Sequence, residues 1–150
     1  MRAACLSAAL LAVSASAVPK KGAPKPPAVS PASAAAVEKA VRQYVKDQVE
    51  EEGSFTLEDE VLGREWDARL MAVRASEARR APEGRVSVCV DFKGEDPKRA
   101  QPLDVDFVLS EGDGEWVVDE VVIHKVGKTP RFAYGADGAR VPLKAKPARK

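Results

Sequence analysis

Hydrophobic and polar residues alternate most regularly between Pro102 and Val126, a stretch that carries the single histidine of the chain. From Leu103 to Leu109 the odd-numbered residues are hydrophobic, which is the period expected of a strand with one buried face. An Asp113-Gly114 pair then interrupts the pattern, and such a pair is the strongest short-range signal for a β-hairpin. We therefore expect two antiparallel strands joined by a tight turn, the second beginning at Trp116.

The second strand of this hairpin contains a change of parity. With a two-residue turn Val118 faces Leu109, but further along the hydrophobic positions shift to Val121 and Ile123. One extra residue restores the facing of a strand, so we expect a β-bulge within Asp119-Glu120. The resulting register places Phe107 opposite Val121, Val105 opposite Ile123 and, on the other face, Asp104 opposite His124.

A helix is expected ahead of the strands, because five residues recur at helical spacing as one hydrophobic stripe: Val37, Val41, Tyr44, Val45 and Val49. Ser30 can cap this helix with Pro31 at the first helical position, or Ser33 can cap a slightly shorter version. Gly53 suits the left-handed position that ends a helix. A stripe this narrow on a helix this long predicts that the helix lies on a sheet.

Three more strands are expected between the helix and the hairpin. The first spans residues 55–61, with Phe55, Leu57 and Val61 on one parity. The second spans residues 66–74 and places alternate residues on one face: Trp66, Ala68, Leu70 and Ala72. That stretch would also suit a helix reaching Arg80. The third, residues 85–92, alternates most clearly, with four hydrophobic residues on one side: Val86, Val88, Val90 and Phe92. Residues 75–84 and 93–101 are polar connections, and residues 131–134 suit a short edge strand.

Together these elements predict the α+β fold class, with one N-terminal amphipathic helix packed on a curved antiparallel sheet of four to six strands. We place this single domain at residues 34–134. Residues 1–17 combine Arg2, a short apolar run and an Ala15-Ser16-Ala17 cleavage site, which predicts a secretory signal peptide. Residues 18–33 are rich in Pro, Lys and Ala and predict a flexible linker, and residues 135–150 predict a basic, disordered tail.

Charge is segregated along the chain. Residues 34–126 hold 22 acidic against 13 basic residues, whereas residues 127–150 hold seven basic residues and one acidic residue. The result is an acidic body with basic ends, and the basic tail is either solvated or in contact with an anionic surface. With eight aromatic residues in all, a stacking platform for nucleic acid is not expected.

The order of one helix followed by long, bent strands resembles the cystatin-like and nuclear-transport-factor-two-like α+β domains, over about residues 34–134. The run VVDEVVIHKVGKTPRF is also similar to the end of small exported bacterial domains that are uncharacterised. This resemblance implies the fold. It does not imply protease inhibition, because the Gln-x-Val-x-Gly loop of cystatin-type inhibitors is absent from the sequence.

Candidate ligand-binding residues lie on the polar side of the predicted strands: His124, Asp104, Asp106 and Asp91. A carboxylate beside an imidazole favours the imidazolium and suits a general base or a small cation, the alternative being a solvated surface pair. We predict no catalytic residue and no metal site, because one histidine among carboxylates lacks the ligand set that transition metals recruit. No cofactor is expected either, since phosphate-loop, nucleophile-elbow and Cys-x-x-Cys motifs are missing.

Cys89 is the one cysteine that remains after removal of the predicted signal peptide, so it has no partner for an internal disulfide. We expect it to be a small, half-buried strand residue. An intermolecular disulfide or a reactive thiol is the alternative.

From these features we expect an exported, periplasmic or extracellular, non-enzymatic module that binds an unknown protein or envelope component, with no nucleic acid partner and no transmembrane segment. The expected contact surface is the polar strand face, through which two copies could also pair: Ser87, Cys89, Asp91, Asp104 and Asp106. The alternative is a small-ligand-binding protein or enzyme with a pocket between helix and sheet that uses His124 and Asp104. A pocket of several hundred Å³ with His124 on its wall favours this alternative.

Overall fold

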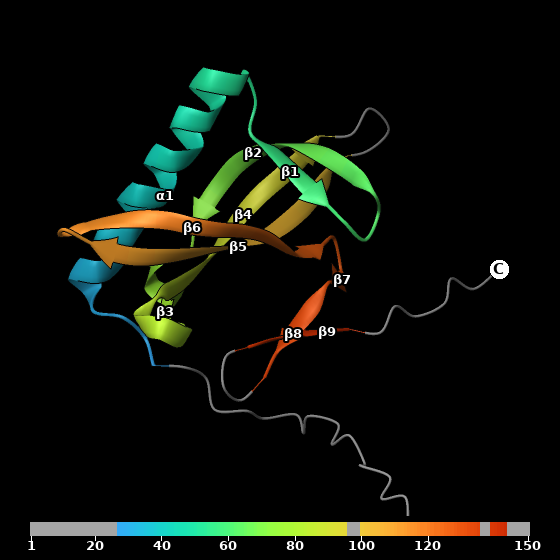
Figure 1. Ribbon diagram of the computed structural model, residues 1–150. Coiled ribbons are helices and arrows are strands. Elements are labelled where there is room, and N and C mark those ends of the chain that lie inside the picture. The colour runs from blue at the N-terminus through green and yellow to red at the C-terminus, as the bar shows by residue number, and fades with distance from the viewer. Residues whose placement is uncertain (1–26, 96–99, 136–138, 144–150) are drawn as a thin grey trace, which may run out of the picture.

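The structure is a computed structural model that describes residues 27–95, 100–135 and 139–143. One helix, α1 (Pro31–Glu52), lies against a strongly curled antiparallel sheet (Figure 1). The strands are β1 (Thr56–Asp59), β2 (Arg64–Val73), β3 (Arg79–Arg80), β4 (Val86–Glu95), β5 (Gln101–Gly112), β6 (Glu115–Val126), β7 (Thr129–Pro130), β8 (Phe132–Tyr134) and β9 (Arg140–Pro142). Single 3-10 turns at Ala75–Glu77 and Pro82–Gly84 flank β3.

Six strands pair in the order β1-β2-β4-β5-β6-β7, and the short β3 pairs with β4 beyond the end of β2. Strands β8 and β9 form a separate hairpin. The predicted α+β class, one helix on an antiparallel sheet, is therefore confirmed. Among the helices that the structure describes, none has both the length and the apolar character needed to cross a membrane.

The ends of α1 follow the predicted capping chemistry. The Ser30 hydroxyl accepts a hydrogen bond from the Ser33 amide at 3.2 Å, and Pro31 takes the first helical position. Gly53 adopts a left-handed conformation with φ 82° and donates its amide to the Val49 carbonyl. Val37, Val41 and Val45 of the expected stripe are buried against the sheet, and each contributes about 1.5–3 kcal/mol relative to exposure. Val49, the last residue of the predicted stripe, is 41% exposed.

The main core lies between α1 and the facing side of the sheet. Alternate residues of β4 and β5 point into it, as predicted: Val86, Val88, Val90, Phe92, Leu103, Val105, Phe107 and Leu109. The rings of Phe55, Phe92 and Phe107 stack on one another, and Tyr44 from α1 meets Phe55 and Phe107 edge to face. Aromatic side chains therefore occupy the space between helix and sheet in which the alternative interpretation placed a pocket.

The hairpin of β5 and β6 has the predicted turn and the predicted bulge. Asp113 and Gly114 both have positive φ, 53° and 79°, as a two-residue type I′ turn requires. The register pairs Leu109 with Val118 and Val108 with Glu120, which leaves Asp119 as the extra residue.

Three strand predictions need correction. Residues 66–73 form a strand, as preferred over the helix, but a bulge at Met71 turns Ala72 away from the core. Val61 lies in the turn after β1 and is 60% exposed, and Asp59 is the residue of β1 buried beside Leu57. The third correction concerns the predicted connection at 93–101, since β4 continues to Glu95. Residues 96–99 lie outside the described residues.

The predicted limits of the domain also change. The linker was expected to reach residue 33, yet Ala28 already bridges to Arg79, and α1 begins at Pro31. The tail was expected from residue 135, yet β9 lies within that range and pairs with β8. The predicted signal peptide at residues 1–17 lies outside the described residues.

Candidate functional site

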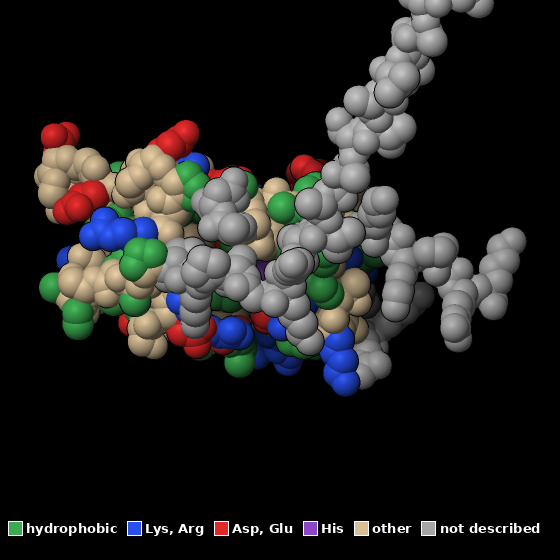
Figure 2. Space-filling model, turned by 90° about the horizontal axis from the view of Figure 1, so that it is seen from below, with side chains coloured by type: hydrophobic (Ala, Val, Ile, Leu, Met, Phe, Trp, Pro, Cys, Tyr) green, Lys and Arg blue, Asp and Glu red, His purple; other side chains and the backbone are tan. Residues whose placement is uncertain are grey.

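The face of the sheet that is turned away from α1 carries a cavity of about 650 Å³, which we call the outer cavity. Its floor comes from three adjacent strands: Ser87 and Cys89 of β4, Asp106 and Val108 of β5, and Glu120 and His124 of β6. One wall is the β8–β9 hairpin with Tyr134 and Arg140, and the opposite wall is the connection around β3. Figure 2 views this end of the molecule and shows basic and acidic side chains interspersed over the described surface.

A second bulge in β6 places His124 on this floor. Val105 pairs with Ile123 as predicted, but Asp104 pairs with Lys125, so His124 is the extra residue between two pairs. The predicted pairing of Asp104 with His124 is therefore wrong. Because of the bulge, the imidazole turns toward the next carboxylate along β5, and His124 Nδ1 lies 3.4 Å from Asp106 Oδ2.

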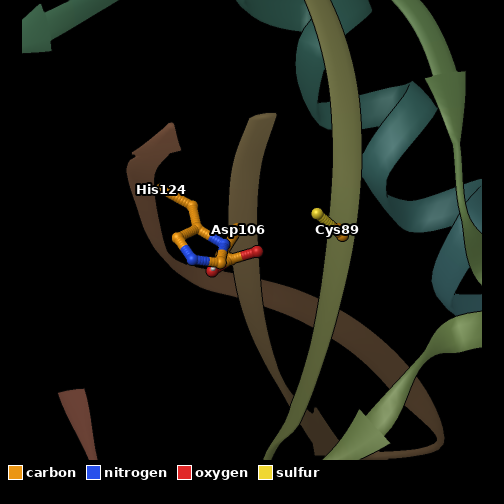
Figure 3. A group of neighbouring side chains, drawn as sticks. All are labelled: Cys89, Asp106 and His124. Atoms are coloured by element: carbon orange, nitrogen blue, oxygen red, sulfur yellow. Dashed lines mark ion pairs between the residues drawn. The ribbon is translucent and has the colours of Figure 1, made fainter. Parts of the chain in front are cut away.

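Asp106 is the centre of a buried polar network, and Figure 3 shows it with Cys89 and His124 on the strands to either side. Its side chain is only 5% exposed, and its Oδ2 accepts a hydrogen bond from the Tyr134 hydroxyl at 2.5 Å as well as facing His124. Cys89 lies directly opposite Asp106 on β4. A buried carboxylate is costly unless it is hydrogen-bonded, and here the Tyr134 phenol from a different element meets that need.

The same burial favours the protonated forms of the Cys89 thiol and the Tyr134 hydroxyl. Loss of hydration, helped by the charge of Asp106, raises the pKa of the Cys89 thiol to about 12. Burial and Asp106 likewise raise the pKa of the Tyr134 hydroxyl above its ordinary value. Cys89 is half-buried, as expected, but a thiol held in its neutral form is a poor nucleophile, so the reactive-thiol alternative is not favoured.

The β8–β9 hairpin is attached to the floor by ring stacking and by the ion pair of Arg140 with Glu120. The Phe132 ring is buried and stacks on His124 with centroids 4.7 Å apart and an interplanar angle of 16°. Arg140 makes a two-pronged ion pair with Glu120, at 2.6 and 2.7 Å, which lowers the pKa of that carboxyl. The sheet face that was predicted to be open for a second copy is thus partly covered by the hairpin.

The other two candidate carboxylates belong to a separate cluster beside the outer cavity. Arg74 hydrogen-bonds both oxygens of Asp91 and approaches Asp104 at 3.8 Å, and Lys125 Nζ lies 2.5 Å from Asp104. The four predicted site residues therefore divide into two pairs. Asp106 and His124 face the outer cavity, whereas Asp91 and Asp104 are occupied by internal ion pairs.

Sequence reasoning missed Tyr134, Arg140 and Arg79 as residues of the site. Tyr134 was placed on a short edge strand, and its contact with Asp106 could not be inferred because 28 residues separate them. Arg140 lies in the range predicted as a tail. Only the polar parity of β4 was a usable signal, since it placed Ser87 and Cys89 on the face that forms the floor.

No protein-family model matches this sequence, and comparison with curated proteins and with solved structures finds no similar protein. The resemblance to cystatin-like domains therefore stays a prediction.

Proposed function

We propose that this chain is a non-enzymatic binding protein for a small organic ligand, and that the outer cavity is its binding site. The observation that carries the proposal is a cavity of about 650 Å³ with His124 on its floor. That volume lies within the range of small-molecule sites. The site differs from the predicted one, because it lies on the outer face of the sheet and uses Asp106 in place of Asp104.

The cavity lining favours an anionic group on the ligand. Arg79 pairs with Ser87, so its side chain leaves the sheet on the cavity side, and it has no ion-pair partner within the described residues. Arg85 and Arg140 also line the cavity, although Glu83 and Glu120 pair with them. In a domain whose body is acidic, this concentration of arginines supports recognition of a carboxylate or phosphate.

The remaining lining favours an apolar body on the same ligand. Ala81, Pro82 and Val108 contribute hydrophobic surface to the cavity lining. Binding sites of this kind combine a mostly apolar lining with a few polar groups that fix orientation. The ligand class we propose is therefore a small amphipathic anion.

A macromolecular partner at the same face is less well supported. Asp106, which was expected to contact the partner, is 3% exposed, and Asp91 and Asp104 already pair with Arg74 and Lys125. A partner would have to replace these contacts. Export of the protein remains part of the proposal on the strength of residues 1–17 alone.

The test uses matched probes that differ in charge but hardly in shape. Phenylacetate and 4-phenylbutyrate, each beside its neutral primary amide, are titrated into the protein while backbone amide shifts are followed by NMR. The acids should shift residues of β3, β4 and β6 around the cavity, and the amides should bind about tenfold or more weakly, as loss of a charged hydrogen bond implies.

Arg79→Gln should remove the preference for the acid, whereas Arg69→Gln, which deletes the same charge from an exposed position on β2 outside the cavity lining, should preserve it. Absence of shifts at the cavity for either acid at millimolar concentration, in a protein shown to be folded, would refute the proposal.

A further inference from the structure

Three side chains on the floor of the outer cavity bring metal-binding atoms together. The thiol of Cys89, a carboxylate oxygen of Asp106 and an imidazole nitrogen of His124 all lie within 4.8 Å of one another. We call this set the donor cluster. Each residue comes from a different one of the three adjacent strands β4, β5 and β6, and Figure 3 shows the imidazole and the carboxylate facing one another, with the cysteine on the neighbouring strand.

The spacing of the donor cluster suits a tetrahedral ion after a small adjustment. Zinc bonds to nitrogen and oxygen of about 2.0–2.1 Å and to sulfur of about 2.3 Å imply donor-to-donor distances of about 3.3–3.8 Å. His124 Nδ1 and Asp106 Oδ2 are already 3.4 Å apart. Because the donor atoms lie within 4.8 Å of one another, the sulfur needs to move by about 1–1.5 Å at most to meet the same range.

The chemistry of the three donors selects the metal. A thiolate with an imidazole and one carboxylate is a borderline-soft set that suits Zn²⁺ and its spectroscopic substitute Co²⁺, whereas Mg²⁺ and Ca²⁺ require mostly oxygen ligands. We propose that Cys89, Asp106 and His124 bind a zinc-class divalent transition metal ion, with the fourth coordination position open to the outer cavity. The sequence alone led us to expect no metal, because it did not show that the cysteine and the histidine meet.

Groups around the donor cluster orient its ligands, as the outer contacts of metal sites do. Tyr134 donates its hydroxyl hydrogen to Asp106, and the Phe132 ring holds the His124 ring by stacking. When the ion binds, the Cys89 S–H bond breaks, a sulfur-to-metal bond forms and the proton leaves to solvent. No electron is transferred, so neither an oxidant nor a reductant is needed.

This inference is based on the donor geometry and does not require the anionic ligand of the proposed function. The two proposals can be tested independently. The acid and amide titrations can be run in the presence of a chelator, and the metal titration needs no organic ligand. If both hold, the positive charge of the ion adds to the preference of the cavity for an anion.

The test is a Co²⁺ titration of the metal-free full chain. We expect one ion per chain, a thiolate-to-cobalt charge-transfer band in the near ultraviolet, and visible ligand-field bands of tetrahedral intensity. One equivalent of Zn²⁺ should abolish them. Cys89→Ser should remove the charge-transfer band, and His124→Gln should weaken binding about tenfold or more, as loss of a ligand contact does.

Matched controls make the result specific to these residues. Asp104→Asn removes a carboxylate that lies on the same face of β5 but outside the donor cluster, so the cobalt spectrum should persist. Cys5→Ser removes the only other cysteine in the sequence and should also leave the band unchanged. Folded protein without a cobalt spectrum, or a charge-transfer band that survives Cys89→Ser, would overturn the proposal.

Discussion

The buried ion pair between Asp59 and Arg131 allows the sharpest prediction about stability. Asp59 is the last residue of β1, and Arg131 lies 72 residues later in the chain, directly before β8. Their side chains are 1% and 11% exposed, and Arg131 Nη2 lies 2.5 Å from Asp59 Oδ2. Trp66 Nε1 and the Leu62 amide donate to the same carboxylate at 3.3 and 3.2 Å.

Replacing Asp59 with Ala leaves the guanidinium of Arg131 buried without its counter-ion. Arg131 Nε already has no hydrogen-bond partner among the described residues. Removal of one member of a buried pair costs about 3–5 kcal/mol of unfolding free energy. Since small domains have only about 5–15 kcal/mol of stability, this loss is a large fraction of the total. Asp59→Asn keeps the acceptor geometry and should cost less, about 1.5–3 kcal/mol.

Urea unfolding monitored by Trp fluorescence measures these losses. The control is the double variant Asp59→Ala with Arg131→Met, which buries no unpaired charge and should recover part of the stability lost in Asp59→Ala. The pair would not have the role we assign to it if Asp59→Ala cost less than about 1 kcal/mol. The same conclusion would follow if the loss of unfolding free energy in the double variant equalled the sum of the losses in Asp59→Ala alone and Arg131→Met alone.

Three further predictions concern the sheet and the Asp106 network. Gly94→Ala should destabilise by about 1–3 kcal/mol in urea because its Cβ would lie 2.8 Å from Trp66, whereas Gly112→Ala meets nothing within 4 Å and should cost less; equal losses would contradict this. In a Cys5→Ser background at about pH 8, Cys89 should react with a disulfide reagent at least about thirtyfold more slowly than a thiol of pKa 9.0, and equal rates in folded and urea-unfolded protein would disprove burial of the thiol. Folding raises the pKa values of Cys89 and Tyr134, so the unfolded chain loses these two protons at lower pH than the folded chain. The contribution of these groups to the free energy of unfolding should therefore be fully present below about pH 9 and should fall as the pH rises toward 12. A flat urea midpoint between about pH 8 and 11 would oppose this, and Tyr134→Phe should reduce the decline.

Local patterns were sufficient for most of the fold. The α1 cap at Ser30, the C-terminal Gly53 and the hairpin turn at Asp113-Gly114 depend on residues within a few positions of one another, and each forms as predicted. The inward parity of β4 and β5 is equally local, because a strand with one buried face alternates with period two. Asp59 was a missed signal, since it shares the parity of Phe55 and Leu57 and is buried with them.

The candidate site was only partly predictable. Asp106 and His124 were named from their polar positions, and both lie on the floor of the outer cavity. Asp104 was assigned to His124 because one bulge was counted in β6 and a second was not. A bulge moves every later residue of a strand by one position relative to its partner, so a single unrecognised bulge changes which side chains meet.

The sequence by itself determined which faces of the helix and most strands are buried, because the spacing of hydrophobic residues repeats with the period of each element. Only the tertiary structure decided what covers the outer face of the sheet. The contacts that build the outer cavity join residues far apart in the chain, such as Tyr134 with Asp106 and Arg140 with Glu120. Contacts between such distant residues produce no repeating pattern in the sequence from which they could be predicted. They depend on where the chain after β7 returns to the sheet, because the β8–β9 hairpin covers the face on which Asp106 and His124 lie.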